Sequence, residues 1–360
     1  MADSDRTYPL RKPKNHRLPV PRYTLTLGDD VGAIYTTYIG VQQHSGNEAA
    51  TFAKTQAIRI MEDWINSDTG PSAFESFTQI EGHDAPNTTS WVCYWTDRAK
   101  YQRSLQTLSL PSIYTELSTS ARSSVGLWLE SFSTAASRLE TNYSGLDYLP
   151  GLARIPDTTV KEHDLATYWG AARDRIPDSA HDLFPTTASE PTGLVTTPRG
   201  IGQRLIGTNR ENMVHIRSGQ FWENCNAEET EAYETKLEPT LRAGLQYLCS
   251  NPVESGAMGI QYLRNISSPH ESGQEVRKET CGAGFFRNLS DLEKWAKGHK
   301  SHLAIYTGAL RHYKMFPENR MMRTWHEVSV LREGEARFEY VNCVAGTGVT
   351  GSLAMEVKSL

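Results

Sequence analysis

The segment Ser290-Asp-Leu-Glu-Lys-Trp-Ala-Lys-Gly-His-Lys-Ser-His-Leu-Ala-Ile-Tyr306 is the part of the chain that most strongly constrains the fold. Its first half places apolar residues at helical spacing, with a serine and a glutamate in the positions of a capping box. Gly298 interrupts this helix, so we expect Ser301 to cap a second helical segment that begins at His302. The segment therefore predicts two consecutive helical pieces, with His302 in an apolar-rich setting at the start of the second.

A strand that carries another histidine follows this segment, Thr324-Trp-His-Glu-Val-Ser-Val-Leu331. Alternation along a strand places His326 on the same face as Val328 and Val330, so its side chain is expected to point into a core or a pocket. A buried histidine of this kind fits a general acid–base role, and it also fits an ordinary hydrogen-bonded core residue. For His302, the pattern fits a metal or haem ligand, or a histidine that satisfies the helix end.

The same order of predicted elements (strand, helix, strand, strand and helix) occurs twice in the chain. The first copy consists of a strand at 33–41, a helix at 47–66, strands at 76–80 and 90–95, and a helix from 96. The second consists of a strand at 212–217, a helix from 226, strands at 259–264 and 281–286, and the helix from 290. This order is typical of the split βαβ, ferredoxin-like unit. We therefore predict an α+β fold in which two such units pair their sheets into an antiparallel β-barrel flanked by helices.

The remaining parts of the chain predict the domain organisation. Residues 1–30 contain prolines among basic residues and are expected to form an extended N-terminal arm. Residues 31–360 are predicted to form a single barrel domain, whose ferredoxin-like halves span about 31–110 and 211–345. The section between them, about 111–210, has a weaker pattern and is expected to be helical or irregular.

Composition argues against several classes of function. The chain has 360 residues and a formal net charge of −5, so no global basic field favours nucleic acid. No apolar run is long enough to span a bilayer, and no membrane partner is expected. The five cysteines are widely spaced and no signal peptide is recognisable, which predicts free thiols and a cytoplasmic location.

Further polar residues are candidates for a site. Ser218 follows a predicted strand in Arg217-Ser-Gly-Gln-Phe-Trp222, where it fits a hydrogen-bond donor to a substrate and equally fits a turn residue. It lacks the flanks of a nucleophile elbow, which argues against a serine hydrolase. Arg173 and Arg175 flank an aspartate and also fit a surface ion pair, while Glu140 is not distinctive by itself.

Five motifs together resemble those of the aldoxime dehydratases, haem-containing enzymes that convert an aldoxime into a nitrile and water. The similarity extends from about residue 15 to the end of the chain. In chain order, the motifs are Tyr168-Trp-Gly-Ala-Ala-Arg-Asp-Arg175, Ile216-Arg-Ser-Gly-Gln220, Leu292-Glu-Lys-Trp-Ala296, Ser301-His-Leu-Ala-Ile-Tyr306 and Trp325-His-Glu-Val-Ser-Val330.

The resemblance implies roles for the residues that match these motifs. His302 would be the proximal ligand of haem b, and His326 would be the distal catalytic histidine. Ser218 would bind the hydroxyl group of the aldoxime substrate. The iron would be ferrous in the active state, because ferric iron is harder and should prefer the oxygen end of the substrate.

The resemblance also implies a distal glutamate and a distal arginine. Glu140 matches the glutamate through a shorter local motif, and the arginine is Arg175 or Arg173. The spacing to Glu140 favours Arg175. The segment Met315-Phe-Pro-Glu-Asn-Arg-Met-Met322, between the two histidines, looks longer than in some family members, so we expect it to line or cover the pocket.

The family fold implied by the resemblance is a dimeric α+β barrel, so the chain is predicted to be a homodimer. Three other interpretations compete with an aldoxime dehydratase. The first is a peroxidase-like enzyme on a similar barrel, since a distal histidine near an arginine is also the peroxidase arrangement. The second is a haem carrier without catalysis, and the third is a purely structural α+β dimer.

Overall fold

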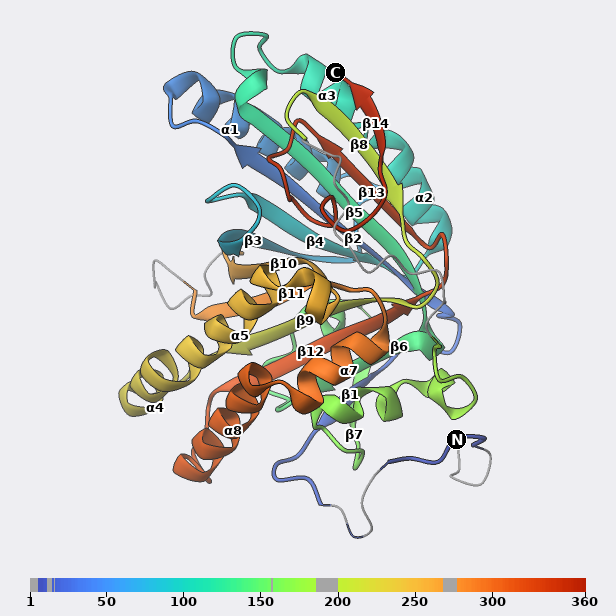
Figure 1. The fold of residues 1–360 in the computed structure, drawn as a ribbon, viewed down its shortest axis with the longest axis vertical. Coiled ribbons are helices and arrows are strands. Elements are labelled where there is room, and N and C mark those ends of the chain that lie inside the picture. The colour runs from blue at the N-terminus through green and yellow to red at the C-terminus, as the bar shows by residue number, and fades with distance from the viewer. Residues whose placement is uncertain (1–5, 12–14, 16, 157, 186–199, 268–276) are drawn as a thin grey trace.

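The structure is a computed structural model that describes residues 6–11, 15, 17–156, 158–185, 200–267 and 277–360 (Figure 1). One antiparallel sheet organises these residues, with the strand order β14-β8-β13-β5-β2-β4-β3-β10-β11-β9-β12-β6-β1-β7. In chain order the strands are β1 (Tyr23–Thr26), β2 (Ala33–Gln43), β3 (Ala73–Gly82), β4 (Thr89–Trp95), β5 (Val125–Ala135), β6 (Leu139–Tyr143), β7 (Thr159–Glu162), β8 (Gln203–Thr208), β9 (Met213–Phe221), β10 (Ala257–Asn265), β11 (Glu279–Phe286), β12 (Arg323–Leu331), β13 (Ala336–Val341) and β14 (Glu356–Ser359).

The two outermost strands, β7 and β14, leave the sheet open. Each has only four residues. Both carry exposed charged side chains, such as Lys161 and Lys358, which disfavour pairing with a further strand. The sheet of the described chain therefore does not close, and the antiparallel barrel that we expected is not formed.

Two groups of four strands, β5-β2-β4-β3 and β10-β11-β9-β12, meet where β3 pairs with β10. The predicted order of strand, helix, strand, strand and helix is observed in both groups. That the groups are ferredoxin-like repeats stays a prediction. The helices are α1 (Glu48–Ile65), α2 (Arg98–Thr107), α3 (Leu110–Glu116), α4 (Ala227–Ala232), α5 (Glu238–Ser250), α6 (Pro252–Ser255), α7 (Leu289–Gly298) and α8 (Lys300–Met315), and the π-helical turn η7 (Tyr233–Leu237) joins α4 to α5.

The middle section, about residues 111–210, differs from the helical or irregular structure that we expected. It contributes the long strand β5 and the shorter strands β6, β7 and β8, with short 3-10 helices between them. Residues 125–132 of β5 are all buried. A strand buried on both faces lacks the alternation of apolar and polar residues that marks a half-exposed strand, so its sequence pattern is weak.

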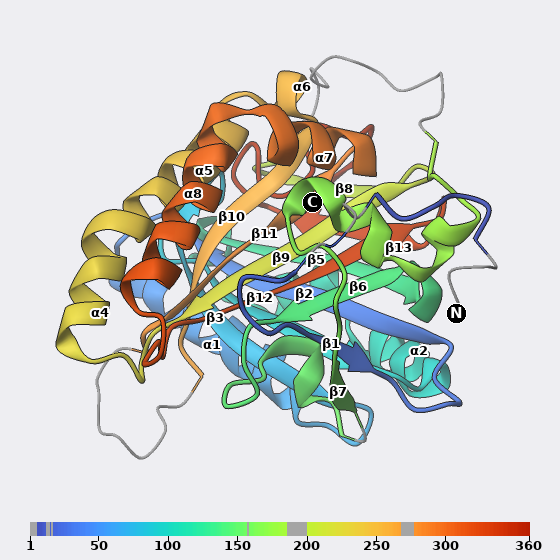
Figure 2. The same ribbon diagram turned by 90° about the horizontal axis from the view of Figure 1, so that it is seen from below.

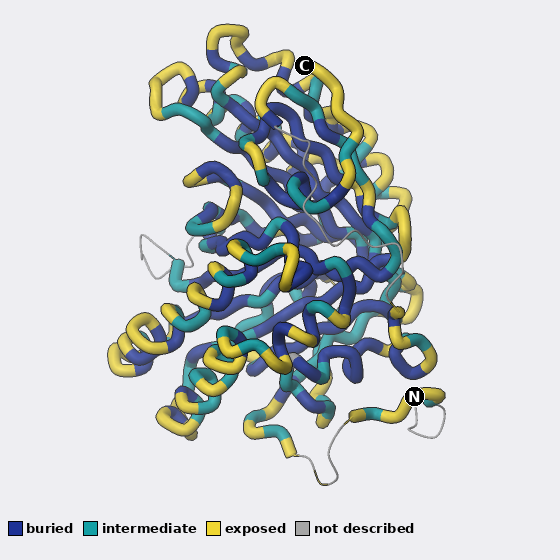
Figure 3. The backbone as a smooth tube through the Cα atoms, in the orientation of Figure 1, coloured by how far each residue is buried: buried dark blue, intermediate teal, exposed yellow. Residues whose placement is uncertain are grey.

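Hydrophobic cores lie on both sides of the sheet. Much of the chain along the central strands is buried (Figure 3). On one side, α1 and α3 cover the first strand group, while α5, α7 and α8 cover the second (Figures 1 and 2). On the other side the two groups contact each other, and the rings of Phe132 and Phe285 lie 5.9 Å apart. None of the described helices has the length and apolar character needed to cross a bilayer.

The predicted N-terminal arm, residues 1–30, includes strand β1, which pairs with β6 and β7. Before this strand, the backbone N–H of Tyr8 donates to the carbonyl of Ala180 at 3.0 Å. The backbone N–H of Arg11 donates to the carboxylate of Asp174 at 2.7 Å. The described parts of the arm therefore lie against the body of the molecule, while residues 1–5, 12–14 and 16 lie outside the described residues.

Candidate active site

A large cavity lies between the sheet face formed by β9, β11 and β12 and the helices α5, α7 and α8. Most of its walls are apolar, with side chains such as Leu241, Leu245, Phe286, Ile305 and Leu310. A cavity of this kind suits a large, mainly apolar ligand that a few polar groups orient.

His302 reaches the cavity from the helix wall. Helix α7 ends at Gly298, and His299 is the N-cap of α8, with its Nδ1 accepting from the Ser301 N–H at 3.3 Å. Ser301, which we expected to be the cap, instead accepts a hydrogen bond from the Trp295 indole at 3.1 Å. His302 thus lies in the first turn of α8, where its ring packs edge-on against Trp295 at 4.7 Å.

The His302 side chain has the protonation state and orientation that a metal ligand requires. It is 3% exposed, and burial lowers its pKa to about 4 although a hydrogen bond with the backbone of Ala296 opposes that shift. The imidazole is therefore neutral at pH 7, the form in which histidine binds a metal. A hydrogen bond to a backbone carbonyl is also a common way to orient a ligating imidazole.

Three polar side chains reach the cavity from the opposite wall, which is the sheet. Ser218 of β9, His326 of β12 and Asn142 of β6 all line it, and His326 is the register partner of both other residues. Register partners on neighbouring strands share one face of a sheet. The amide nitrogen of Asn142 is buried and has no hydrogen-bond acceptor among the described residues. The cavity therefore has hydrogen-bonding groups on the sheet wall, facing the helix wall that holds His302.

A buried carboxylate, Glu140, and a buried guanidinium, Arg175, accompany His326. Glu140 Oε1 accepts from His326 Nε2 at 2.8 Å and from Arg175 Nε at 2.5 Å, and Arg175 Nη2 lies 3.5 Å from the same histidine nitrogen. Burial would raise the pKa of Glu140, but Arg175 and His326 outweigh it and lower that pKa to about 2. Burial lowers the pKa of His326, while Glu140 acts in the opposite direction. An ionised Glu140 thus favours the protonated imidazole.

The second candidate arginine, Arg173, is not part of this cluster. Its Nη2 contacts Glu293 of α7 at 3.1 Å and Ser290 at 3.5 Å. Both Arg173 and Arg175 belong to the 3-10 helix η5 (Trp169–Arg175), which has about three residues per turn, so side chains two positions apart point in different directions. The geometry therefore brings Arg175, and not Arg173, to Glu140 and His326.

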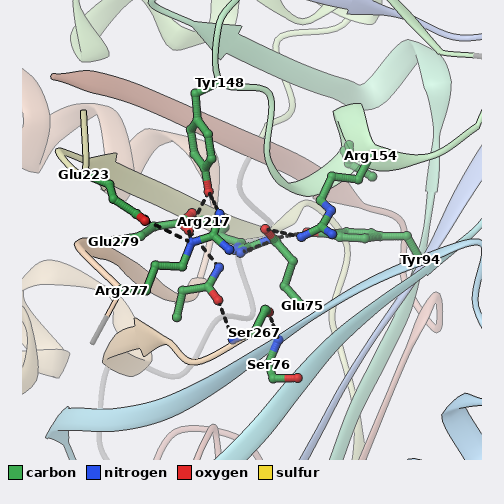
Figure 4. Close-up of polar contacts among 12 residues, drawn as sticks. Glu75, Ser76, Tyr94, Tyr148, Arg154, Arg217, Glu223, Ser267, Arg277 and Glu279 are labelled. Carbon is green, nitrogen blue, oxygen red and sulfur yellow. Dashed lines mark hydrogen bonds and ion pairs between the residues drawn. The ribbon is translucent and has the colours of Figure 1, made fainter. Parts of the chain in front are cut away.

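Figure 4 shows a buried polar network around Arg217 and Glu75. Strand alternation places Arg217 on the face of β9 opposite to Ser218. Arg217 of β9, which is fully buried, donates to Glu75 at 2.6 Å and to the Tyr94 hydroxyl at 2.6 Å. The same hydroxyl donates to Glu327 of β12 at 2.9 Å. Because Arg217 and Glu327 are register partners, this network fixes β9 against β12.

Some of these residues were not singled out from the sequence. Arg217 and Glu327 are charged residues inside strands, next to the two candidate site residues, and strand alternation alone places them on the other face. Asn142, two residues after Glu140, offered no distinctive motif. Of the segment Met315–Met322, which we expected to line or cover the pocket, Met322 lines the cavity.

The arrangement fits a bound haem. No group of three or more His, Cys, Asp or Glu side chains that could hold a bare metal ion is found in the part of the chain that the structure describes. Haem iron needs only one axial protein ligand, and His302 is a buried neutral imidazole on an apolar wall.

Comparisons with known proteins show which family the chain is similar to. A family model described as haem-containing dehydratase matches residues 37–349. The chain is 29% identical to an aliphatic aldoxime dehydratase of Pseudomonas chlororaphis, over 96% of this chain and 94% of that protein. It is 27% identical to a phenylacetaldoxime dehydratase of Bacillus sp. (strain OxB-1), over 93% and 92% of the two chains.

Solved structures show the same similarity. A crystal structure of an aldoxime dehydratase superimposes with a TM-score of 0.82 and 28% identity, over 97% of this chain and 96% of that one. An aldoxime dehydratase in complex with butyraldoxime superimposes with a TM-score of 0.81 and 26% identity, over 97% of this chain and 94% of that one.

Proposed function

This chain belongs to the haem-containing dehydratase family, and from that premise we propose that it dehydrates aldoximes to nitriles at a bound haem. The observation that carries the proposal is the placement of His302 and His326 on opposite walls of one apolar cavity. The similar proteins that are named for aldoxime dehydration match nearly the whole chain, which supports the same reaction.

His302 would hold the haem from the helix wall. When bound, haem would supply an iron that can bind the aldoxime nitrogen, and the iron would be ferrous because ferric iron should prefer the oxygen end. The apolar side chains of α5 and β11 surround the substrate chain and exclude water from the reacting groups. Both alkyl and aryl chains are compatible with such walls.

Ser218 and His326 would act on the substrate from the sheet wall. The Ser218 hydroxyl donates a hydrogen bond to the oxygen of the N–OH group and orients it. Protonated His326 gives its proton to that oxygen as the N–O bond breaks, so that water leaves. The neutral imidazole then takes the proton from the aldoxime carbon, which yields the nitrile and restores the imidazolium. One aldoxime thus gives one nitrile and one water, with no net proton consumed.

Glu140 and Arg175 would set the protonation state of His326. Arg175 helps to keep Glu140 ionised, and the carboxylate stabilises the imidazolium through the 2.8 Å hydrogen bond. We assign the distal arginine role to Arg175 and not to Arg173, whose guanidinium pairs with Glu293.

We also keep as proposals a single domain over residues 31–360 built from two ferredoxin-like halves, a homodimer and a cytoplasmic location. The shared strand order supports the two halves.

The proposal is tested by the visible spectrum of the purified protein, followed by nitrile formation from a neutral alkyl aldoxime with dithionite present. We expect a Soret band in the wild type and its loss in His302→Ala, since no second histidine lines the helix wall among the described residues. His299→Ala is the matched control, because His299 lies in the same helix junction but outside the cavity lining. A His302→Ala protein with an unchanged Soret band would exclude this ligand.

The same assays separate the competing functions. Turnover of hydrogen peroxide without turnover of aldoximes would indicate a peroxidase-like enzyme. Transfer of haem to an acceptor protein without any turnover would indicate a carrier. A colourless protein, even with haem supplied during expression, would indicate a structural role.

A further inference from the structure

We propose that Arg22 and Tyr313 form a carboxylate-binding subsite within the haem cavity. Arg22 immediately precedes β1, lines the cavity and is 8% exposed. Its Nη2 donates to the Tyr313 hydroxyl at 2.8 Å, and its guanidinium lies 5.5 Å from the centre of the Tyr313 ring. Its other terminal nitrogen, Nη1, is buried and has no acceptor among the residues that the structure describes.

The surroundings of Arg22 contain an excess of positive charge. The guanidinium of Arg320 lies 4.4 Å from the centre of the same Tyr313 ring. Neither arginine forms an ion pair with a carboxylate of the described chain. Burial would raise the pKa of Tyr313, but the two arginines and a hydrogen bond with Thr324 lower it.

Two buried carboxylates of this region, Glu140 and Glu229, already have partners. Glu140 binds Arg175 and His326. The two oxygens of Glu229 accept hydrogen bonds from His312 and from the backbone N–H groups of two residues after α8, Met321 and Met322. The residues that the structure describes therefore supply no anion for Arg22.

A buried guanidinium N–H without an acceptor loses its hydration and gains nothing in return, so a ligand that supplies the acceptor is favoured. Arginine presents a planar pair of donors that suits a carboxylate. Burial is the main cause that lowers the pKa of His326, and the charges of Arg175 and Arg22 act in the same direction. Arg22 is thus close enough to His326 for its charge to be felt at the proposed reacting end of the cavity.

Two carboxylates could occupy this subsite, and both depend on the proposed function. Haem b carries two carboxylate side chains, and an aldoxime can carry one at the far end of its chain. The experiment therefore compares each carboxylate with its methyl ester, which keeps the shape and removes the charge.

The first measurement is the rate of haem loss from the holoprotein to apomyoglobin, followed by absorbance. Wild type and Arg22→Gln are each loaded with haem or with haem dimethyl ester. If the haem carboxylate is bound, Arg22→Gln speeds the loss of haem about tenfold to hundredfold but leaves the loss of the dimethyl ester unchanged. Arg320→Gln is the matched control, because it removes a charge beside the same tyrosine without lining the cavity.

The second measurement is the dissociation constant of 5-(hydroxyimino)pentanoic acid and of its methyl ester, from the shift of the Soret band. If the substrate carboxylate is bound, the wild type prefers the acid by about tenfold or more, and Arg22→Gln loses that preference. Arg22→Lys, which keeps the positive charge, should retain part of the preference for the acid over the methyl ester.

Either preference for the acid supports the subsite and identifies its ligand if Arg22→Gln loses it, and a preference that Arg22→Gln retains excludes Arg22 from the subsite. The subsite is excluded if the wild type treats acids and esters alike in both measurements, a comparison that needs no folded variant. The proposed function is tested separately, by nitrile formation from a neutral alkyl aldoxime. Its failure can be distinguished from failure of the subsite, because the rate of haem loss does not depend on turnover.

Discussion

His326 has neighbours that favour opposite protonation states. Burial and the nearby arginines lower its pKa, whereas the charge and hydrogen bond of Glu140 raise it. A general acid must be protonated when the leaving group departs. In the proposed mechanism, the carboxylate of Glu140 would therefore be the group that favours the imidazolium in a site that otherwise disfavours it.

Glu140→Gln should reduce turnover and change its pH dependence. This substitution removes the negative charge of Glu140 and weakens its hydrogen bond, which both raise the pKa of His326. The pKa of His326 should therefore fall further, and the imidazolium should be lost at a lower pH. We expect kcat at pH 7 to fall about 10- to 100-fold and the decline of kcat with rising pH to shift to lower pH. The measurement is kcat from pH 5 to pH 9, with the Soret band as a check for haem.

Glu293→Gln is the matched control for this substitution. It also removes a buried carboxylate from an arginine of η5, since Glu293 contacts Arg173 at 3.1 Å. It should leave the pH dependence of kcat as in the wild type. Equal pH profiles for Glu140→Gln and the wild type would remove Glu140 from the proposed mechanism.

The two faces of strands β9 and β12 carry different groups of polar side chains. One face presents Ser218 and His326 to the cavity, and the other buries Arg217 and Glu327 in a polar network. Since a shift of one residue in register would exchange the two faces, the network and the cavity residues constrain each other.

Gly219 of β9 allows Trp325 of β12 to pack directly against the strand. A Cβ atom at position 219 would lie 2.2 Å from Cε2 of Trp325, which is buried and stacked on Arg217 at 4.5 Å. Gly219→Ala should therefore lower the free energy of unfolding by about 1–3 kcal/mol through overpacking. It should also lower kcat, because β9 and β12 carry Ser218 and His326.

Urea unfolding and kcat of Gly219→Ala check this prediction. Gly351→Ala is the control for the backbone entropy of a glycine replacement, because no atom lies within 4 Å of its added Cβ. A Gly219→Ala protein as stable and active as Gly351→Ala would show that Trp325 can move without consequence.

The whole molecule buries carboxylates far from the cavity, and their titration contributes to its stability. Glu130 of β5 lies between strands and accepts from the Tyr340 hydroxyl at 2.6 Å. Burial raises its pKa from 4.5 to about 7. Between these values the folded state binds more protons than the unfolded state, so this group makes the free energy of unfolding fall as pH rises.

Glu130→Gln should remove this contribution while it keeps an acceptor for Tyr340. The free energy of unfolding of Glu130→Gln minus that of the wild type should increase from pH 5 to about pH 7 and then stay constant. The total increase in this difference should be up to about 3 kcal/mol. Urea unfolding at several pH values measures the difference, and Glu62→Gln, on the exposed face of α1, is the control for removing a carboxylate. A stability difference that is independent of pH would contradict the raised pKa of Glu130.

Local patterns in the sequence were sufficient for the elements that carry the candidate site. Strand alternation predicted that His326 faces a core or a pocket, and in the structure it lines the cavity. The interruption at Gly298 predicted a new helix around His302, and α8 begins there. Such features depend on residues within one or two turns of each other, so their physical causes are contained in a short segment.

Contacts between distant segments could not be predicted in this way. Glu140 and His326 are 186 positions apart, and their hydrogen bond depends on the pairing of β6 with β12. The choice between Arg173 and Arg175 depends on how η5 docks on the sheet, and the open sheet depends on its two outermost strands. Because pairing and burial of distant segments are properties of the assembled chain, only the tertiary structure determined which polar side chains share the cavity.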